Sequence, residues 1–149
     1  MGRSTLDLDL LTTRRDVLEP SFWRPLESGD IAVEVRRGDP DDPLAGAVRF
    51  RGSEVEPVDL IVGRFDWQTE IVERARRLPL IDGGVPVADA ADLILLKLYA
   101  GGSQDAWDIE QLLAAGDVER LRARVCEGID RLPPEAGELW RRIAGGRGH

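Results

Sequence analysis

A ten-residue stretch near the start of the chain, STLDLDLLTT at positions 4–13, constrains the fold more than any other. Its leucines alternate with Asp7 and Asp9, and alternation at period two predicts a strand with one apolar and one polar face. Both aspartates then leave the same side of the strand, about 7 Å apart. They are either acids shown to solvent by a half-buried strand or two metal ligands on a rigid element. Because Asp is a poor strand former, two of them in one strand favour the ligand interpretation.

The remainder of the first half predicts a small mixed sheet. Short alternating or apolar runs bounded by Gly, Pro or Asp predict three more strands, at Ile31–Arg36, Ala47–Arg51 and Pro57–Gly63. Arg14–Ser28 is predicted to be a helical segment broken by two prolines. Phe65–Arg77 is predicted to be a helix, and Leu78–Val87 a hairpin around an Asp-Gly-Gly turn.

The second half is predicted to be helical. Four helices are expected, at Asp89–Ala100, Ser103 to about Ala115, Asp117–Arg131 and Glu135–Ala144. Gly101-Gly102 closes the first of these helices, and Ser103 is expected to cap the second. The fold class is therefore α+β. We expect a sheet domain at residues 1–87, a helical part of the same compact unit at 88–144, and a disordered tail at 145–149.

Composition excludes several classes of function. The single cysteine, Cys126, rules out an internal disulfide framework and a cysteine-based zinc site, and favours a reducing cytoplasm. The only histidine is His149, the last residue, so serine–histidine catalysis and histidine-ligated zinc are excluded as well. The net charge of −8 argues against broad, non-specific binding to nucleic acid. No apolar run approaches the roughly 18 residues that span a membrane, and no signal peptide is recognisable. We expect a cytoplasmic protein with no membrane partner.

A third acid, Asp59, interrupts the apolar run PVDLIVG. A strand that is apolar on both faces is expected inside a sheet covered on both sides, where a carboxylate needs a cation or several donors. That cation is either an arginine of the preceding strand, such as Arg49 or Arg51, or a metal ion shared with Asp7 and Asp9. Carboxylates favour Mg²⁺ or Mn²⁺, and three of them can hold two ions for phosphoryl-type transfer.

Lys97 is the only lysine among twenty Lys and Arg residues, and it lies in the most apolar predicted helix, DLILLKLYAGG. A flexible point charge for a phosphate calls for Lys in particular. The alternative is a surface lysine whose stem covers apolar neighbours while its ammonium reaches water. Asp105 and Asp108 follow three residues apart on one helix face. Asp105 also suits the first turn of a helix, whereas Asp108 is a candidate to orient Lys97 or to contact substrate.

With these residues in view, the sequence resembles the nucleotidyltransferase-fold toxins of the AbiEii/MenT-like group, within the DNA polymerase β superfamily. The resemblance lies in RSTLDLDLL at Arg3–Leu11, PVDLIV at Pro57–Val62, and VPVADAADLILLKLYAGGSQDAWDIEQLL at Val85–Leu113. The last stretch is the most specific, because it joins an Asp-Leu pair, a lysine and an Asp-x-x-Asp motif in one order.

The resemblance implies a catalytic set of Asp7, Asp9, Asp59, Lys97 and Asp108. Of these, the first three would bind Mg²⁺ (or Mn²⁺), Lys97 would hold the triphosphate, and Asp105 or Asp108 would complete the site. The implied reaction moves a nucleoside monophosphate from an NTP to an acceptor, either a tRNA end or a protein hydroxyl. A toxin–antitoxin pair with a cognate antitoxin is implied too.

The N-terminal region departs from this pattern. Members of the superfamily carry a helix with a Gly-Gly or Gly-Ser turn before the Asp-x-Asp strand, whereas here the strand follows Met1-Gly2-Arg3-Ser4. Either a natural N-terminal piece precedes this sequence, or Gly2 and Ser4 form a shortened nucleotide-binding turn, or nucleotide binding is impaired. A sheet without that helix exposes an edge, so we expect either a homodimer or another partner that covers this edge. Two other functions remain open: a non-catalytic binding or regulatory module, and a metal-dependent phosphohydrolase.

Overall fold

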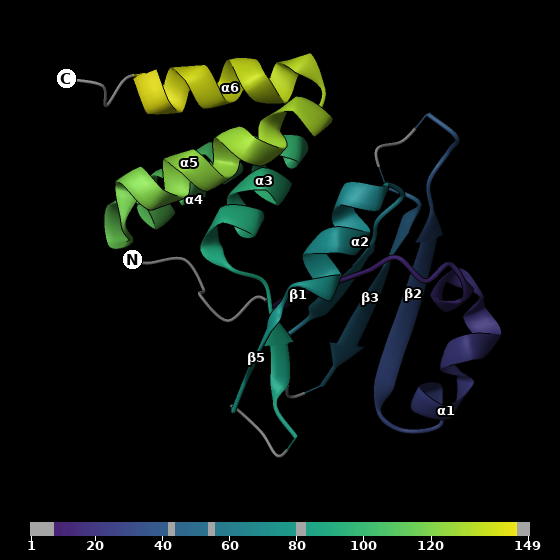
Figure 1. The fold of residues 1–149 in the computed structure, drawn as a ribbon. Coiled ribbons are helices and arrows are strands. Elements are labelled where there is room, and N and C mark those ends of the chain that lie inside the picture. Colours follow the sequence, from purple (N-terminus) through teal and green to yellow (C-terminus); the bar gives the residue numbers. More distant parts are fainter. Residues whose placement is uncertain (1–7, 42–43, 54–55, 80–82, 146–149) are drawn as a thin grey trace. The chain divides into compact units, whose positions relative to one another are not determined.

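The computed structural model describes residues 8–41, 44–53, 56–79 and 83–145. It has the predicted α+β class, with a small mixed sheet and several helices (Figure 1). The chain divides into two compact units, a sheet unit of residues 1–73 and a helical unit of residues 74–149. Across the described ranges, no helix combines the length and apolar character that crossing a bilayer requires.

The sheet unit contains the four predicted strands. They are β1 (Leu8–Thr12), β2 (Ile31–Arg37), β3 (Gly46–Gly52) and β4 (Val58–Val62). Their order is β1-β4-β3-β2, with β1 parallel to β4 and the other neighbours antiparallel. Among the described residues, β1 and β2 therefore form the two edges of the sheet. The parallel β1–β4 pair brings the two strands that carry the predicted metal ligands side by side.

One face of the sheet packs on the segment between β1 and β2. That segment is the predicted broken helix, seen as η1 (Asp16–Leu18), η2 (Pro20–Trp23) and α1 (Arg24–Glu27). Its core residues Val17 and Leu18 are buried against strand residues Val48, Leu60 and Val62. The Trp23 side chain joins this cluster and donates a hydrogen bond from Nε1 to the Val17 carbonyl, at 2.7 Å.

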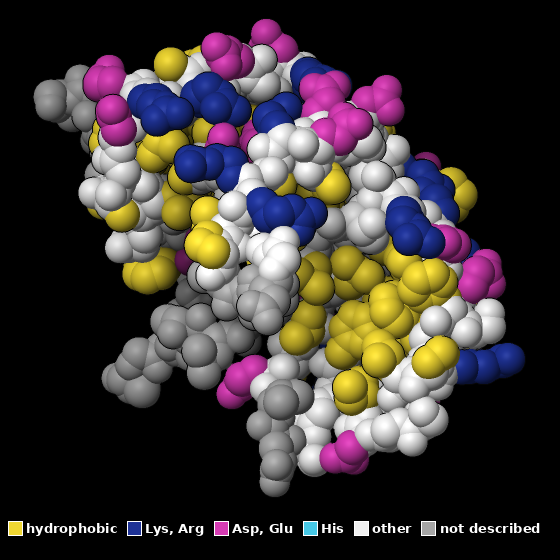
Figure 2. Space-filling model, turned by 60° about the horizontal axis from the view of Figure 1, so that its bottom comes forward, with side chains coloured by type: hydrophobic (Ala, Val, Ile, Leu, Met, Phe, Trp, Pro, Cys, Tyr) yellow, Lys and Arg dark blue, Asp and Glu magenta, His cyan; other side chains and the backbone are white. Residues whose placement is uncertain are grey.

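This core leaves some large apolar side chains open to solvent. In the sheet unit, Leu10, Phe22 and Leu26 are each about 40% exposed. The space-filling view shows apolar side chains gathered in one broad patch at the surface (Figure 2).

The helix after β4 is shorter than predicted. Helix α2 spans Asp66–Glu73, and its start is held by the buried Gln68, whose Oε1 accepts hydrogen bonds from the N–H groups of Arg64 and Phe65. The prediction that this helix reaches Arg77 is wrong. Arg74 turns instead to the carboxylate of Asp92, and the next residues join a strand. Tertiary contacts thus override helix propensity at this end.

The predicted hairpin is present and begins two residues earlier than expected. Strand β5 (Arg76–Leu78) pairs antiparallel with β6 (Val85–Val87). Gly83 and Gly84 of the connecting turn have φ angles of +83° and +79°, which suit glycine. Residues 80–82 of the turn lie outside the described residues. The hairpin belongs to the helical unit, although the predicted boundary lay after residue 87.

The helical unit contains the four predicted helices. They are α3 (Ala90–Ala100), α4 (Ser103–Ala115), α5 (Val118–Gly128, followed by η3 at Ile129–Arg131) and α6 (Pro134–Gly145). Helix α3 contacts α4, α5 and α6, and its residues Ile94 and Leu98 are fully buried. The predicted tail begins one residue too early, because Gly145 ends α6; residues 146–149 lie outside the described ranges.

The turn between α3 and α4 places the candidate polar residues. Gly101 ends α3 in the left-handed conformation, with φ +71°. The predicted cap at Ser103 is wrong: Gly102 is the N-cap, and Ser103 is the first residue of the helix. The Gly102 N–H donates to Asp105 Oδ2 at 3.0 Å, so Asp105 does the capping from inside the first turn.

Candidate functional site

Two of the three predicted metal ligands are neighbours on the sheet. In the parallel pairing of β1 with β4, Asp9 stands opposite Asp59. Residues paired across adjacent strands project from the same face, so both carboxylates leave the sheet side by side. This is the face opposite the one that carries Val48, Leu60 and Val62. Asp7 and Ser4, the other candidates of this region, lie outside the described residues.

Asp59 has an arginine on its other side. Arg49 of β3 pairs with Asp59 in the register, and its Nε lies 3.7 Å from Asp59 Oδ1. The side chains are 43% and 35% exposed, respectively, so the expectation that Asp59 is buried in a sheet covered on both sides is wrong. Glu34 of β2 pairs in turn with Arg49, which completes a row of Asp9, Asp59, Arg49 and Glu34 across the sheet.

This row offers oxygen ligands to a cation but not a complete cage. Among the described residues no group of three acidic, histidine or cysteine side chains is close enough to hold a metal ion. The pair of Asp9 and Asp59 supplies hard oxygen donors, the type that Mg²⁺ prefers. Arg49 approaches one oxygen of Asp59 at a distance beyond a normal hydrogen bond. The donor chemistry therefore fits a divalent cation that takes its remaining ligands from a phosphate, from water or from residues outside the described ranges.

A second cluster lies in the helical unit around Lys97. Lys97 Nζ donates to Asp108 Oδ2 at 2.8 Å and lies 3.8 Å from Asp105 Oδ1. Gln104 donates to the other oxygen of Asp108 at 2.9 Å. The Lys97 and Asp108 side chains are 20% and 19% exposed, and that of Asp105 is 27% exposed. The ammonium is thus held between two carboxylates of α4 rather than reaching into open water.

The sequence spacing explains this cluster. Lys97 lies in the last turn of α3, and the Gly101-Gly102 turn brings the start of α4 back beside it. Asp105 and Asp108, three residues apart, share the side of α4 that meets α3. One lysine and two carboxylates carry a formal charge of −1, and partial exposure leaves the ammonium accessible to an incoming anion.

The two clusters belong to different units of the chain. Asp9 and Asp59 are in the sheet unit, and Lys97, Asp105 and Asp108 are in the helical unit. Each predicted group is therefore assembled locally, by strand register in one case and by a helix turn in the other.

Sequence reasoning missed a third charged cluster, at the start of α3. Asp92 is 2% exposed and accepts two hydrogen bonds from Arg74, from Nε at 2.9 Å and from Nη2 at 2.7 Å. Arg124 of α5 lies 4.0 Å from Asp92 and donates to Asp89 at 3.3 Å, and Asp89 caps α3 by accepting from the Asp92 N–H. The sequence signal that could have predicted this cluster is an aspartate within an apolar helix, in a chain that is rich in arginine.

Three arginines of the arginine-rich stretches at 74–77 and 120–124 make contacts within the helical unit. Arg74 follows α2 and binds a buried carboxylate, and Arg124 is bound to Asp89. Arg122 donates to the carbonyl of Ala144 at 2.8 Å. These three arginines connect parts of the helical unit instead of forming an open basic surface.

Comparison with known proteins adds no assignment: no family model matches the chain, and no curated protein matches it. The resemblance to nucleotidyltransferase-fold toxins therefore rests on the motifs alone.

Proposed function

We propose that this protein is a Mg²⁺-dependent nucleotidyltransferase that moves a nucleoside monophosphate from an NTP to a hydroxyl acceptor. The observation that carries the proposal is the pairing of Asp9 with Asp59 on adjacent parallel strands, with both carboxylates on one face. An Asp-x-Asp strand beside a strand with a third acid is the arrangement that the motif resemblance implies. The acceptor is a tRNA end or a protein hydroxyl, and the protein is the toxin of a toxin–antitoxin pair.

The proposed chemistry is a displacement at the α-phosphorus. The acceptor hydroxyl gives its proton to solvent water, and its oxygen forms a bond to the α-phosphorus. The bond from this phosphorus to the bridging oxygen breaks, which releases pyrophosphate. Mg²⁺, or Mn²⁺, bound by Asp7, Asp9 and Asp59 would neutralise the charge that develops on these oxygens.

Lys97 is assigned to the triphosphate. An ammonium held at 2.8 Å by one carboxylate and at 3.8 Å by a second is oriented without being fully buried. Asp108, and Gln104 behind it, fix the position of the ammonium, and Asp105 assists nucleotide binding from the first turn of α4. A lysine suits this role because its compact charge can exchange one oxygen partner for another.

The test is label transfer from a panel of α-labelled NTPs with Mg²⁺, with total tRNA and cell lysate as acceptors. We expect wild type to transfer label. Asp9→Asn and Asp59→Asn should each lose on the order of 10³-fold, because each removes a ligand of the metal ion that supplies several kcal/mol of charge stabilisation. The matched control is Asp41→Asn, a change of the same kind at an exposed position of the sheet unit.

Equal transfer by wild type and Asp9→Asn would contradict the proposal, and so would the absence of transfer from every NTP onto either acceptor. Lys97→Met should raise the KM for the NTP, whereas Arg120→Met, at an exposed position of α5, should leave it unchanged.

One observation favours a second candidate, a non-catalytic binding module of the same fold. Arg49 lies 3.7 Å from Asp59 and pairs with Glu34 on its other side, so the charged row also makes sense as a cross-strand ladder that stabilises the sheet. For such a module, calorimetry would detect NTP binding while no label is transferred. The Arg49→Gln variant addresses both candidates. If the row is a structural ladder, the variant should lower the free energy of unfolding of the protein. If the protein is an enzyme, the variant should still transfer label.

A further inference from the structure

The exposed face of α4 carries no charge. Every residue of this helix is described, and its three acids, at positions 105, 108 and 110, are all partly buried. The exposed residues are Ser103, Gln104, Trp107, Gln111, Ala114 and Ala115. The exposed ends of the adjoining turns, Gly101-Gly102 before the helix and Gly116 after it, extend the same uncharged strip.

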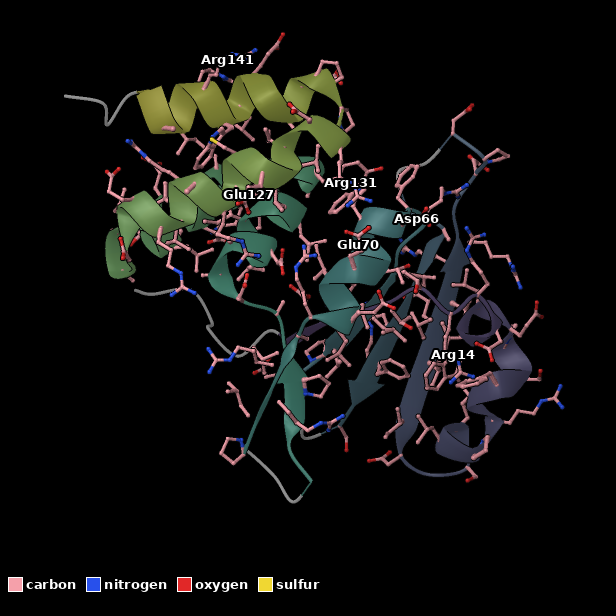
Figure 3. The ribbon with its side chains drawn as sticks, viewed as in Figure 1. Arg14, Asp66, Glu70, Glu127, Arg131 and Arg141 are labelled. Atoms are coloured by element: carbon pink, nitrogen blue, oxygen red, sulfur yellow. The ribbon has the colours of Figure 1, made fainter. Side chains whose placement is uncertain are left out.

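The neighbouring helices are different. The exposed positions of α5 include Glu119, Arg120 and Glu127, and those of α6 include Glu138 and Arg141. Arg141 points away from the other helices of the unit (Figure 3). In a chain of which 32% is charged, an exposed helical face without a single charge needs a reason. Depletion of charge at the centre is the mark of a protein–protein interface.

Trp107 lies at the centre of this face. The other three tryptophans are packed: Trp67 and Trp140 are each 6% exposed, and Trp23 is partly buried and donates to a backbone carbonyl. Trp107 is 50% exposed. Tryptophan is strongly enriched among the residues that contribute most to binding at interfaces.

We propose that the α4 face, defined as residues 103, 104, 107, 111, 114 and 115, is the contact through which two copies of this chain form a homodimer. A chain of net charge −8 repels its own copy, and an uncharged face adds no local contact between like charges to that repulsion. A partner chosen by charge would instead be expected to meet a basic or acidic surface. The uncharged face therefore fits a second copy better than an oppositely charged protein.

The order of the side chains is itself self-complementary. Gln104 and Gln111 lie about 10 Å apart along the helix, on either side of Trp107. If two α4 helices cross antiparallel with the two-fold axis beside Trp107, Gln104 of one copy faces Gln111 of the other. A glutamine amide both donates and accepts, so the two form matched hydrogen bonds, as an isologous contact requires. This proposal does not rest on the nucleotidyltransferase activity or on the sheet edge, although Gln104 also donates a hydrogen bond to Asp108.

One helical face is smaller than the roughly 1,600 Å² of a standard interface, so we expect a dimer that dissociates in the micromolar range. Sedimentation velocity of the full chain across that range should show a concentration-dependent shift from monomer to dimer. Added salt should strengthen the dimer, because salt screens the net charge and there is no interfacial ion pair to weaken.

Two variants locate the contact. Trp107→Ala removes the central side chain. Gln111→Glu removes the amide donor that faces Gln104 of the other copy and buries a carboxylate there. Each change should weaken the dimer at least about tenfold, which is 1.4 kcal/mol. The matched control is Ala123→Glu, which adds the same charge at an exposed position of α5 and should leave the dimer unchanged. Far-UV circular dichroism identifies any variant that fails to fold. Gln111→Glu exchanges one helix former for another at an exposed position, so this variant should fold and its effect on the dimer can be interpreted.

Cross-linking tests the antiparallel geometry. In a Cys126→Ser background, an oxidised mixture of the Gln104→Cys and Gln111→Cys proteins should give a covalent dimer, whereas each protein alone should give much less. A wild-type chain that stays monomeric throughout the micromolar range would overturn the proposal. So would a dimer that Gln111→Glu and Ala123→Glu affect equally, since the contact would then lie on another face.

Discussion

Two carboxylate clusters lie within the helical unit, and they differ in how much solvent reaches them. At the start of α3, the Asp92 side chain is 2% exposed, and Arg74 occupies both of its oxygens. At the end of the same helix, Lys97 and Asp108 are about 20% exposed, and the cation is a lysine. The buried Asp92 carboxylate has both oxygens bound by Arg74 and cannot bind a ligand as well. The partly exposed Lys97 ammonium can exchange a carboxylate for a ligand oxygen. We therefore interpret the Asp92 cluster as structural and the Lys97 cluster as functional.

The largest expected effect on stability is at Asp92. Asp92→Asn removes the charge that holds Arg74, so the Arg74 guanidinium loses its bidentate contact with a carboxylate. Loss of one member of a buried ion pair costs roughly 3–5 kcal/mol, but Arg74 is 42% exposed and can turn to water, so we expect about 2–3 kcal/mol. Urea denaturation followed by circular dichroism measures it, with Glu138→Gln on the exposed face of α6 as control. A loss equal to that of the control would break the structural interpretation.

Lys97→Met is expected to separate stability from function. Methionine keeps the apolar stem and removes the ammonium, and Asp108 retains its hydrogen bond from Gln104, so the free energy of unfolding should fall by only about 1 kcal/mol. Nucleotide binding, measured by calorimetry, should be weakened, in line with the expected rise in KM. If Lys97→Met lowers the free energy of unfolding as much as Asp92→Asn does and retains nucleotide binding, both clusters are structural. That result would contradict the functional interpretation of the Lys97 cluster.

A smaller effect is expected at Asp105, which belongs to the Lys97 cluster and also caps α4. Asp105→Asn keeps an oxygen that can accept from the Gly102 N–H and removes the charge 3.8 Å from Lys97, whereas Asp105→Ala removes both. We expect Asp105→Ala to cost about 0.5–1 kcal/mol, the usual range for a lost helix cap, and Asp105→Asn to cost less. Thermal unfolding of the two variants, compared with wild type, separates capping from charge. Equal losses would assign the whole effect to the charge.

The smallest effect is expected at the ion pair of Arg14 and Asp16 in the sheet unit, whose side chains are 65% and 52% exposed. Arg14 donates two hydrogen bonds to Asp16, which lower the pKa of the Asp16 carboxyl, and its guanidinium lies over the Phe22 ring. A lowered pKa in the folded state stabilises the protein above the unfolded value, and this contribution is lost as the pH falls through the folded value. Arg14→Gln should therefore reduce stability slightly at neutral pH and not at all in acid. Denaturation at several pH values checks this sign, and a difference that grows in acid would contradict it.

The local pattern predicted most of the fold. Alternating and apolar runs in the first half predicted all four strands of the sheet, and glycine and proline positions helped to predict the four helices of the second half. The predictions failed where a contact with a residue far away in the sequence determines the local structure. The helix after β4 stops at Glu73 because Arg74 binds Asp92, eighteen residues further along the chain, and no local signal marks that contact.

The candidate sites follow the same division. The sequence by itself determined the acids of the first strand, the apolar run broken by Asp59, and the single lysine followed by Asp-x-x-Asp, because each is a matter of residue type and spacing. Only the tertiary structure decided that Asp59 stands beside Asp9 and Arg49, because strand order and register depend on which strands pair. It also decided that Lys97 is bound by Asp108, that Asp92 is dry, and that the exposed side of α4 has no charge. Burial and partnership result from packing between segments that are far apart in the chain, and a linear pattern does not record them.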